Sequence, residues 1–412
     1  MVADVAPNSG DEIIISDGEV RILRCIDSTG KQIWEFDGNW LMHLTSVAAI
    51  SFNVNLDFPV LAIGNPDGKL CCLNASTSEE LWTKNIIKIE WGSPVWADLD
   101  GDGQDELIAA TEFDGITAFK ADGAVLWTYR EDADGNPVVV RCPITAKDVD
   151  GDGKSEVFAV DRWGPLSLSH DGELLWHQRS GNEFISGVEV TDIDGDGKYD
   201  VFCASQDDNL VYRIDAENGN IIWNVPMLSK CDVYPNSYYP TGDLNKDGKS
   251  EVIVCDKDGN VYCINSSGKK LWTFTTPKPI HASAALADID GDGNLDVIIT
   301  SGDHFVYVLG AEGDLKGKYE EDRRLMAPAT IADVNKNERK DILFGGSGRK
   351  LNSISVSDKM TSEETEFLSE IEGSNKNKAK EIFSLFNKGG FELAKNPDFP
   401  FEQVIFGSAG IV

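Results

Sequence analysis

The sequence predicts an all-β chain folded as a ring of repeated small sheets, and three observations carry this prediction. An acidic nine-residue motif recurs along the chain at steps of 44 to 51 residues. Short segments of alternating or β-branched residues, separated by Gly/Asp turns, fill the space between the motifs. A tryptophan closes most of the repeats. Because four strands in about 45 residues make one propeller blade, the predicted fold is a β-propeller of eight four-stranded blades.

The first residue of the acidic motif defines the repeats. The complete copies resemble DLDGDGQDE, which begins at Asp98, whereas the copy at Asp333 is degraded and the first two copies are eroded. The eight lead residues are Asp4, Asn53, Asp98, Asp148, Asp192, Asp243, Asp288 and Asp333. One blade cannot bury both faces of its sheet, so neighbouring repeats must stack around an axis. Residues 1–357 are therefore predicted to form one propeller domain.

Four short strands are predicted in each repeat, in a fixed order. A segment of small and β-branched residues, such as GSPVWADLD, leads into the acidic loop, and a strand such as ELIAAT follows it. A third strand, such as NVYCIN, comes after a Gly/Asp turn. The fourth strand ends on tryptophan in six repeats, at Trp34, Trp82, Trp127, Trp176, Trp223 and Trp272, and the seventh copy, GDLKGKYEE, lacks it. Buried aromatic residues mostly serve packing, so these tryptophans are expected to pack between blades.

The repeat pattern ends near Ser357, and residues 358–412 are predicted to form a short, partly helical tail. The stretches MTSEETEFLSEIEG and NKNKAKEIFSLFNKGG have the polar or amphipathic pattern of helices. The last stretch, PDFPFEQVIFGSAGIV, resembles LDFPVLAIGNPDG near residue 57. It is therefore either a strand that closes the ring or the start of another repeat.

Composition and charge exclude several classes of partner. The net charge of −33 disfavours nucleic acids and anionic membranes, because both attract a basic surface. No apolar run reaches the eighteen or so residues of a transmembrane helix, so no membrane insertion is expected. The eight cysteines form no C-x-x-C pair, which disfavours a structural zinc site. The start, MVADVAPNSGDEIIIS, lacks the basic and apolar blocks of a signal peptide, so the chain is either cytosolic or already without its leader. A monomer is expected.

The spacing of the acidic loops excludes an EF-hand. An EF-hand places a bidentate acid at position 12, between two helices. In the complete copies, none of the residues at position 12 has a carboxylate that could act as this bidentate ligand. They are Ala109, Ala159, Cys203, Val254 and Ile299. The last acid instead stands at position 9, and a β-type segment follows it directly. The acidic loop is therefore predicted to join two strands.

The residue types in the loop match the chemistry of Ca²⁺, which takes six to eight oxygen ligands with loose geometry. Positions 1, 3 and 5 supply carboxylates, position 7 is placed to offer a backbone carbonyl, and position 9 closes the cage. A glycine at position 6 permits the sharp bend. The absence of His and Cys disfavours zinc and copper, and Mg²⁺ demands stricter geometry. The alternative, a set of ordinary polar Asp/Gly turns, leaves five complete copies in register without a reason.

Two resemblances rest on these motifs. The loops, D-x-D-G-D-G-x-x-[DE] followed by a strand, resemble the FG-GAP or VCBS-type repeats of integrin α-subunit propellers and of many bacterial surface proteins. The tryptophan-ended strands, such as IDAENGNIIW and CIDSTGKQIW, resemble the blades of pyrroloquinoline-quinone-type propellers. The first resemblance implies Ca²⁺ binding and a location outside the cytoplasm, at the cell surface, secreted or in the periplasm. The second implies only the fold.

The first resemblance implies about five Ca²⁺ sites, one in each complete loop, with ligands at positions 1, 3, 5, 7 and 9. The implied ligands are Asp98, Asp100, Asp102, Gln104 and Glu106; Asp148, Asp150, Asp152, Lys154 and Glu156; Asp192, Asp194, Asp196, Lys198 and Asp200; Asp243, Asn245, Asp247, Lys249 and Glu251; and Asp288, Asp290, Asp292, Asn294 and Asp296, with the position-7 residues acting through their carbonyls.

The three other copies depart from this pattern. A sixth, weak site is expected at Asp333, Asn335, Asn337, Arg339 and Asp341, where Glu338 replaces the glycine. The copy at Asn53 has Leu61 at position 9, and the copy at Asp4 has Ala6 and Gly10. Neither of these two is expected to bind an ion.

A candidate ligand rim is predicted on the face opposite the acidic loops, where the connections between blades open. Seven residues before four of the lead positions stand Trp91, Arg141, Asn236 and His281, a set that suits a sugar or an acidic group. The alternative is that these are ordinary rim residues.

Three function classes remain open from the sequence. The first is a non-catalytic, Ca²⁺-stabilised scaffold for adhesion, which binds a protein or glycan. The second is a polysaccharide lyase or hydrolase, with Arg141 and His281 as its candidate groups. The third is a quinoprotein-like dehydrogenase, whose motif the sequence does not match. With five histidines in all and no recognisable catalytic triad, the scaffold is the expected function.

Overall fold

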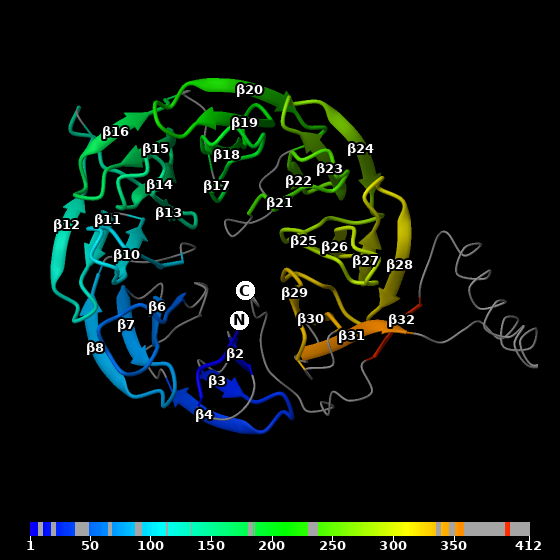
Figure 1. Cartoon of the computed structure of the whole chain (residues 1–412), viewed down its shortest axis with the longest axis horizontal. Coiled ribbons are helices and arrows are strands. Elements are labelled where there is room, and N and C mark those ends of the chain that lie inside the picture. Colours follow the sequence, from blue (N-terminus) through cyan, green and yellow to red (C-terminus); the bar gives the residue numbers. More distant parts are fainter. Residues whose placement is uncertain are drawn as a thin grey trace, which may run out of the picture.

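The structure, a computed structural model, describes residues 1–6, 11–17, 22–37, 49–64, 68–86, 93–112, 114–132, 134–179, 184, 186–229, 238–334, 339–345, 351–357 and 392–395. Its strands form eight four-stranded sheets arranged as blades around a central axis (Figure 1). The predicted eight-bladed propeller is therefore confirmed. No helix within the described ranges is long and apolar enough to span a membrane.

Each blade is a meander of four consecutive antiparallel strands. Blades 1 to 4 contain β1 (Val2–Ala3), β2 (Glu12–Asp17), β3 (Ile22–Ile26) and β4 (Gln32–Asp37); β5 (Ala49–Ser51), β6 (Val60–Gly64), β7 (Lys69–Asn74) and β8 (Glu80–Asn85); β9 (Val95–Ala97), β10 (Glu106–Thr111), β11 (Gly115–Phe119) and β12 (Val125–Tyr129); and β13 (Thr145–Lys147), β14 (Glu156–Asp161), β15 (Gly164–Leu168) and β16 (Leu174–His177).

The second half of the ring repeats this arrangement. Blades 5 to 8 contain β17 (Glu189–Thr191), β18 (Asp200–Ser205), β19 (Leu210–Asp215) and β20 (Ile221–Pro226); β21 (Thr241–Gly242), β22 (Glu251–Cys255), β23 (Asn260–Asn265) and β24 (Lys270–Thr275); β25 (Ala285–Ala287), β26 (Asp296–Thr300), β27 (Phe305–Leu309) and β28 (Leu315–Glu320); and β29 (Thr330–Ala332), β30 (Asp341–Gly345), β31 (Leu351–Ser357) and β32 (Glu392–Lys395). The first strand of each blade lies nearest the axis and the fourth forms the outer rim (Figure 1).

The hydrophobic core lies between the blades, because the second and third strands are covered on both faces. All six residues of β10 and of β14 are buried, for example. One buried cluster joins Ile14 and Leu23 of blade 1 to Leu61 and Leu73 of blade 2, and comparable clusters join each later pair of blades. The ring is closed by apolar packing of blade 8 against blade 1. The buried residues of this contact are Ile13, Ile15, Ile26, Val334, Leu343 and Leu351.

The tryptophans pack between blades, as predicted. Each indole nitrogen donates a hydrogen bond to a backbone carbonyl in the next blade, over 2.7–2.9 Å: Trp34 to Ala75, Trp82 to Ala121, Trp127 to His170, Trp176 to Ala216, Trp223 to Ser266 and Trp272 to Ala311. In blade 7 the same register position, opposite Val308, is Gly317. The repeated tryptophan therefore fastens each of the first six blades to its successor.

The tail contributes a strand to the eighth blade. β32 pairs antiparallel with β31, so that Ser357 lies opposite Glu392 and Ile354 opposite Lys395. The helices predicted within 358–391 and the closing segment predicted at 397–412 lie outside the described residues. The boundary proposed at residue 357 thus stays a prediction, although the fourth strand of blade 8 comes from beyond it.

The meander assigns the loops to two faces of the ring. Because successive strands alternate in direction, the loops between first and second strands share one face with the turns between third and fourth strands. The turns between second and third strands and the connections between blades share the other face. The acidic loops therefore lie on one face, and the connections that contain Arg141 and His281 lie on the opposite one.

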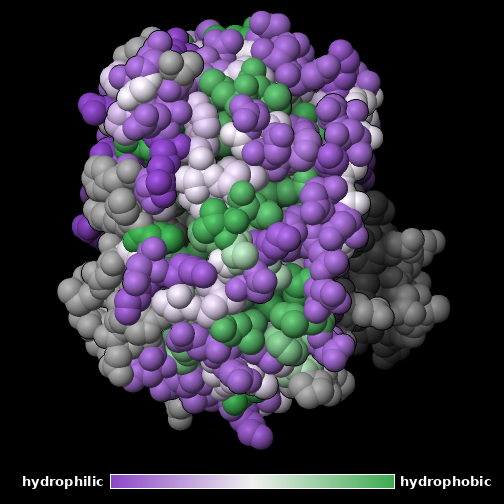
Figure 2. Space-filling model, turned by 90° about the vertical axis from the view of Figure 1, so that its left-hand side faces the viewer, coloured by the Kyte–Doolittle hydropathy of each residue, from purple (hydrophilic) through white to green (hydrophobic). Residues whose placement is uncertain are grey.

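The outer rim carries exposed apolar side chains among charged ones. Figure 2, which shows the side of the ring with β8, β12 and β16, displays apolar patches separated by hydrophilic residues. Five fourth strands expose an aliphatic residue just before their tryptophan: Ile33, Leu126, Leu175, Ile222 and Leu271. The corresponding residue of blade 7 is Lys316.

Candidate metal loops

The acidic loops join two strands, which confirms the argument against an EF-hand. In blade 3 the loop runs between β9 and β10, and Glu106 at its end pairs with Ala97 at its start. The same hairpin recurs in blade 4, where Glu156 pairs with Lys147, and in blade 7, where Asp296 pairs with Ala287. The first and last acids of each loop are therefore held close together by the sheet itself.

Backbone hydrogen bonds fix the shape of the loop in blade 3. Asp98 accepts from the amides of Gly101 and Gly103 at 2.8 and 2.9 Å, one bond to each carboxylate oxygen. Asp102 accepts from the amide of Gln104 at 2.8 Å. Gly103 has a φ of +85°, a conformation that a side chain would strain, which explains the glycine at position 6. The loop turns tightly enough to gather several carboxylates on one side.

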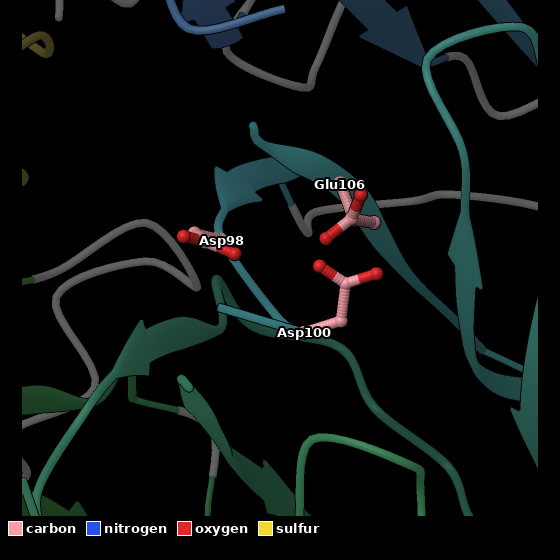
Figure 3. Close-up of side chains that lie close together, drawn as sticks. All are labelled: Asp98, Asp100 and Glu106. Carbon is pink, nitrogen blue, oxygen red and sulfur yellow. The ribbon is translucent and has the colours of Figure 1, made fainter. Parts of the chain in front are cut away.

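Four loops bring three carboxylates together, with oxygens within 4.8 Å of one another. These trios are Asp98, Asp100 and Glu106; Asp148, Asp150 and Glu156; Asp192, Asp194 and Asp196; and Asp288, Asp290 and Asp296. In Figure 3 the side chains of Asp98, Asp100 and Glu106 converge on a common space. Such clusters have the oxygen-rich chemistry of a site for a hard cation.

The acid at position 9 has a second role, which the sequence did not indicate. One of its oxygens accepts the backbone N–H of position 2 in each loop that the structure describes with an acid there. The accepting residues are Glu12 from Val5, Glu106 from Leu99, Glu156 from Val149, Asp200 from Ile193, Glu251 from Leu244, Asp296 from Ile289 and Asp341 from Val334. Position 9 thus ties the hairpin together independently of any cation, which explains its retention in the eroded copy at Asp4.

Electrostatics in the loops of blades 3 and 4 favour a bound cation. Burial raises the pKa of Glu106 to about 7, and the neighbouring charges of Asp100, Asp102 and Asp98 add to this effect. The pKa of Glu156 is raised in the same way, first by burial and then by its acidic neighbours. Negative charge in these two loops is therefore in excess, and a divalent ion would offset it.

The loop of blade 5 has a basic side chain among its carboxylates. Arg213 of β19 donates from Nε to Asp200 and from Nη2 to Asp194, both at 2.7 Å. Its third nitrogen, Nη1, donates to the carbonyl of Ser266 in blade 6 at 2.7 Å. Burial opposes ionisation of Asp194, but Arg213 outweighs it and lowers the pKa of that carboxyl.

The loop of blade 7 likewise contains a cation from its own blade. Lys316 Nζ lies 2.8 Å from Asp290, 3.1 Å from Asp292 and 2.8 Å from Asp296. Neither Lys316 nor Arg213 belongs to the acidic motif, so the motif did not predict either residue at these sites. Alignment of the repeats carries the missing signal: Lys316 replaces an aliphatic residue, and Arg213 replaces the small residues Cys25, Cys72 and Cys263.

The loop of blade 6 is built differently from the others. Asn245 replaces an aspartate at position 3, and its amide donates to Glu251 at 2.9 Å. Lys246 replaces the glycine at position 4 and takes a φ of 59°. The carboxylates of Asp243 still accept backbone amides from Asp247 and Gly248, so the turn is kept.

The degraded loops lack these clusters within the described part of the chain. At the weak copy, the structure describes Asp333, Arg339 and Asp341, whereas Asn335 and Asn337 lie outside the described residues. In the copy at Asn53, position 9 is the fully buried Leu61, which supplies no oxygen ligand from its side chain.

Of the predicted ligand rim, the structure describes Arg141 and His281. Arg141 pairs with Glu112, with Nε at 3.0 Å and Nη2 at 2.9 Å from the same carboxylate oxygen. His281 lies against Gly302, and burial followed by the positive charge of Arg324 lowers its pKa. Arg141 precedes β13 and His281 precedes β25, which lie on opposite sides of the axis (Figure 1). Trp91 and Asn236 lie outside the described residues.

Two regions of the chain match known protein families. Residues 16–164 match the family described as outer membrane protein assembly factor BamB. Residues 214–286 match the family described as the λ-carrageenase β-propeller domain. The λ-carrageenases of Pseudoalteromonas sp. and Pseudoalteromonas carrageenovora are each 33% identical over 72 residues. That alignment covers 17% of this chain and only 7% of the relatives' length.

Solved structures show the same fold at low sequence identity. BamB from Moraxella catarrhalis has a TM-score of 0.57 at 18% identity, with 83% of this chain and 91% of that chain covered. The V. cholerae biofilm matrix protein Bap1 has a TM-score of 0.62 at 12% identity, with 82% and 81% covered. A europium-containing methanol dehydrogenase has a TM-score of 0.57 at 10% identity, with 87% and 83% covered. The chain is thus an eight-bladed β-propeller that resembles BamB in blades 1 to 4 and the λ-carrageenase propeller domain around blade 6.

Proposed function

We propose that this protein is a non-catalytic propeller scaffold, stabilised by Ca²⁺ in its acidic loops, that binds a protein or glycan on the opposite face. The observation that carries the proposal is the convergence of Asp98, Asp100 and Glu106, repeated by Asp148, Asp150 and Glu156. Three carboxylates with oxygens within 4.8 Å of one another repel, and after burial this repulsion helps raise the pKa of Glu106 to about 7. A bound divalent ion offsets the repulsion, so ion binding adds to folding stability.

The donor set supports Ca²⁺ as the ion. The side chains at positions 1, 3, 5 and 9 in the loops of blades 3 and 4 are all carboxylates, and backbone amides donate to at least one oxygen of each. Ca²⁺ accepts such irregular all-oxygen cages, whereas Mg²⁺ requires near-octahedral geometry. The FG-GAP or VCBS-type resemblance of the motif points in the same direction. We propose the same chemistry for the blade 6 loop, with Asn245 supplying an amide oxygen.

The proposed location is the periplasm, the cell surface or the extracellular space. Ca²⁺ sites of moderate affinity fill where Ca²⁺ is abundant, which favours these compartments over the cytoplasm. The similarity of blades 1 to 4 to BamB, named as an outer membrane protein assembly factor, supports this location.

A carbohydrate-active enzyme is the second candidate, and one specific observation favours it. The match to the λ-carrageenase propeller family covers residues 214–286, which lie in blades 5 and 6 and include the loop that starts at Asp243. Against catalysis, Arg141 is paired with Glu112, and His281 precedes β25, a strand that lies on the other side of the axis from β13 (Figure 1). The shared region is one short part of a much longer relative, which suits a binding module.

One experiment separates the two candidates. The Ca²⁺-loaded protein is incubated with sulfated galactans and with uronate polymers, and both retention and polymer chain length are measured. The scaffold proposal expects retention of a polymer, or of a protein partner, with unchanged chain length. Shortened polymers, or a new product that absorbs in the ultraviolet, contradict the scaffold and establish the enzyme.

A further inference from the structure

Blade 7 departs from the repeat at three positions that lie together. Lys316 stands where six other blades have Ile or Leu, and Gly317 stands where they have tryptophan. Gly310 opens the turn between β27 and β28, where its backbone N–H donates to the carbonyl of Asp314. The equivalent residue in other blades is Asp27, Asn74, Lys120, Ser169, Asp215 or Asn265. Lys316 contacts the acidic loop of the same blade, and Gly310 lies beside the Lys316 side chain.

Two of these changes, Lys316 and Gly310, let the lysine side chain enter the loop. A Cβ on Gly310 would lie 2.7 Å from Asp314 Oδ1 and 3.2 Å from Lys316 Cε, so a side chain there would crowd both residues, and glycine leaves the path of the lysine clear. The Lys316 side chain is 15% exposed, whereas the aliphatic residue at its position is 37–50% exposed in five other blades. The lysine therefore folds inward instead of pointing to solvent.

Lys316 Nζ lies among the carboxylates of the acidic loop, where a bound cation would lie. It contacts the carboxylates at loop positions 3, 5 and 9, namely Asp290, Asp292 and Asp296, at 2.8–3.1 Å. Asp296 is fully buried, so removal of the ammonium group would leave a buried negative charge without this partner. An ammonium and a Ca²⁺ ion cannot occupy the same set of oxygens, because their charges repel at such distances.

Blade 5 reaches the same result from another strand. Arg213 comes from β19 and not from the fourth strand, yet it also binds loop positions 3 and 9 through Asp194 and Asp200. Its side chain is 8% exposed, and it also donates to Ser266 in blade 6. Two unrelated substitutions thus deliver a basic group to equivalent carboxylates.

We propose that Lys316 and Arg213 are built-in cations that replace a metal ion in the acidic loops of blades 7 and 5. The ring then has two kinds of loop, one that needs a metal ion and one neutralised by its own chain. This inference refines the proposed function and rests on it for the identity of the ion in the other loops. It reduces the number of Ca²⁺ sites implied by the motif alone, since blades 5 and 7 no longer need an ion.

The test counts ions bound by full-length variants in equilibrium dialysis against Ca²⁺. Lys316→Met is compared with Lys318→Met, which removes the same charge from an exposed lysine on the same strand, beside Phe305. The inference expects Lys316→Met to bind one more Ca²⁺ per chain than wild type, and Lys318→Met to bind the wild-type number. Equal numbers in all three proteins overturn it and leave the Ca²⁺ proposal intact.

Two further measurements keep the test decisive. If wild type binds no Ca²⁺, the proposed function fails, and the melting temperature in EDTA then tests the inference: Lys316→Met must melt below Lys318→Met, and equal melting contradicts it. If Lys316→Met does not fold, the reciprocal blade 3 variant Lys120→Gly/Leu126→Lys replaces it. That variant is expected to lose one Ca²⁺ relative to wild type, and an unchanged number overturns the inference.

Discussion

The indole ring of Trp127 in blade 3 lies directly against Gly172 in blade 4. A Cβ on Gly172 would stand 2.6 Å from Cδ2 of the ring, and the indole nitrogen donates to the carbonyl of the nearby His170 at 2.8 Å. The same contact joins Trp82 to Gly123, Trp176 to Gly219, Trp223 to Gly268 and Trp272 to Gly313. The turn between the third and fourth strands of one blade thus receives the tryptophan of the blade before it.

Gly172→Ala is expected to destabilise the propeller for two reasons. The residue has a φ of +85°, which costs an L-residue about 1–2 kcal/mol. Overlap with the indole ring adds about 1–3 kcal/mol. Gly135→Ala is the matched control, because its φ is +78° but no atom lies within 4 Å of the added Cβ. Urea denaturation should show the larger loss for Gly172→Ala, and equal losses would contradict the packing role of Trp127.

Position 9 of the loop is expected to stabilise the protein even where no ion binds. Glu12 accepts the amides of Val5 and Ala6 through one oxygen at 2.8 and 2.9 Å, in a loop whose pattern is eroded. Glu12→Ala leaves two backbone amides near the core without this acceptor, so it should lower the free energy of unfolding by about 1–3 kcal/mol. The loss should be the same in Ca²⁺ and in EDTA. A loss that appears only in Ca²⁺ would mean that this loop also binds an ion.

Glu106→Gln is expected to behave in the opposite way. Its amide oxygen retains an acceptor for the amide of Leu99, but the variant loses a charged Ca²⁺ ligand. In EDTA the variant should be at least as stable as wild type, because one of several mutually repelling charges is gone. In Ca²⁺ it should melt below wild type. A variant that melts like wild type in both buffers would contradict the assignment of Glu106 as a ligand.

A pH dependence is expected from the inner strand of blade 5. Burial raises the pKa of Glu189 in β17 to about 7, and the same carboxylate, after burial, helps raise the pKa of Tyr238 to about 12. Folded Glu189 therefore holds a proton that the unfolded chain releases near its ordinary pKa of 4.5. This stabilises the fold below pH 4.5, and the contribution is lost as the pH rises through about 7.

Glu189→Gln removes this dependence, because glutamine does not titrate. Between pH 5 and pH 8, the melting temperature of wild type in EDTA should fall more than that of the variant. The comparison is made in EDTA so that Ca²⁺ binding does not vary with pH. Parallel curves for the two proteins would show that Glu189 titrates normally in the folded state.

The repeat made the fold predictable from the sequence, and local motifs made most of the loops predictable. The register of Trp34 to Trp272 and the acid at position 9 are local patterns, so a strand–loop–strand unit with an interblade tryptophan followed from them. Arg213 and Lys316 could not be read in this way. Their carboxylate partners lie 13–19 and 20–26 residues away along the chain, and only the pairing of strands brings them together.

The ring closure and the rim were also beyond the local pattern. Ile13 and Ile15 pack against Leu343 and Leu351, which joins segments from opposite ends of the chain. No sequence motif predicts this contact. The register of Arg141 and His281 could be counted from the lead residues. Their partners, Glu112 and Gly302, depend on how each inter-blade connection lies against the strand ends.

Binding of Ca²⁺ by the acidic loops is tested by the dependence of thermal stability on Ca²⁺. Wild type and the double variant Asp98→Asn/Asp148→Asn are melted in EDTA and in Ca²⁺. At a Ca²⁺ concentration 100 times Kd, each occupied loop adds about 2.7 kcal/mol, so wild type should melt several degrees higher in Ca²⁺. The double variant should lose most of that increase. An identical melting temperature for wild type in the two buffers would contradict the account.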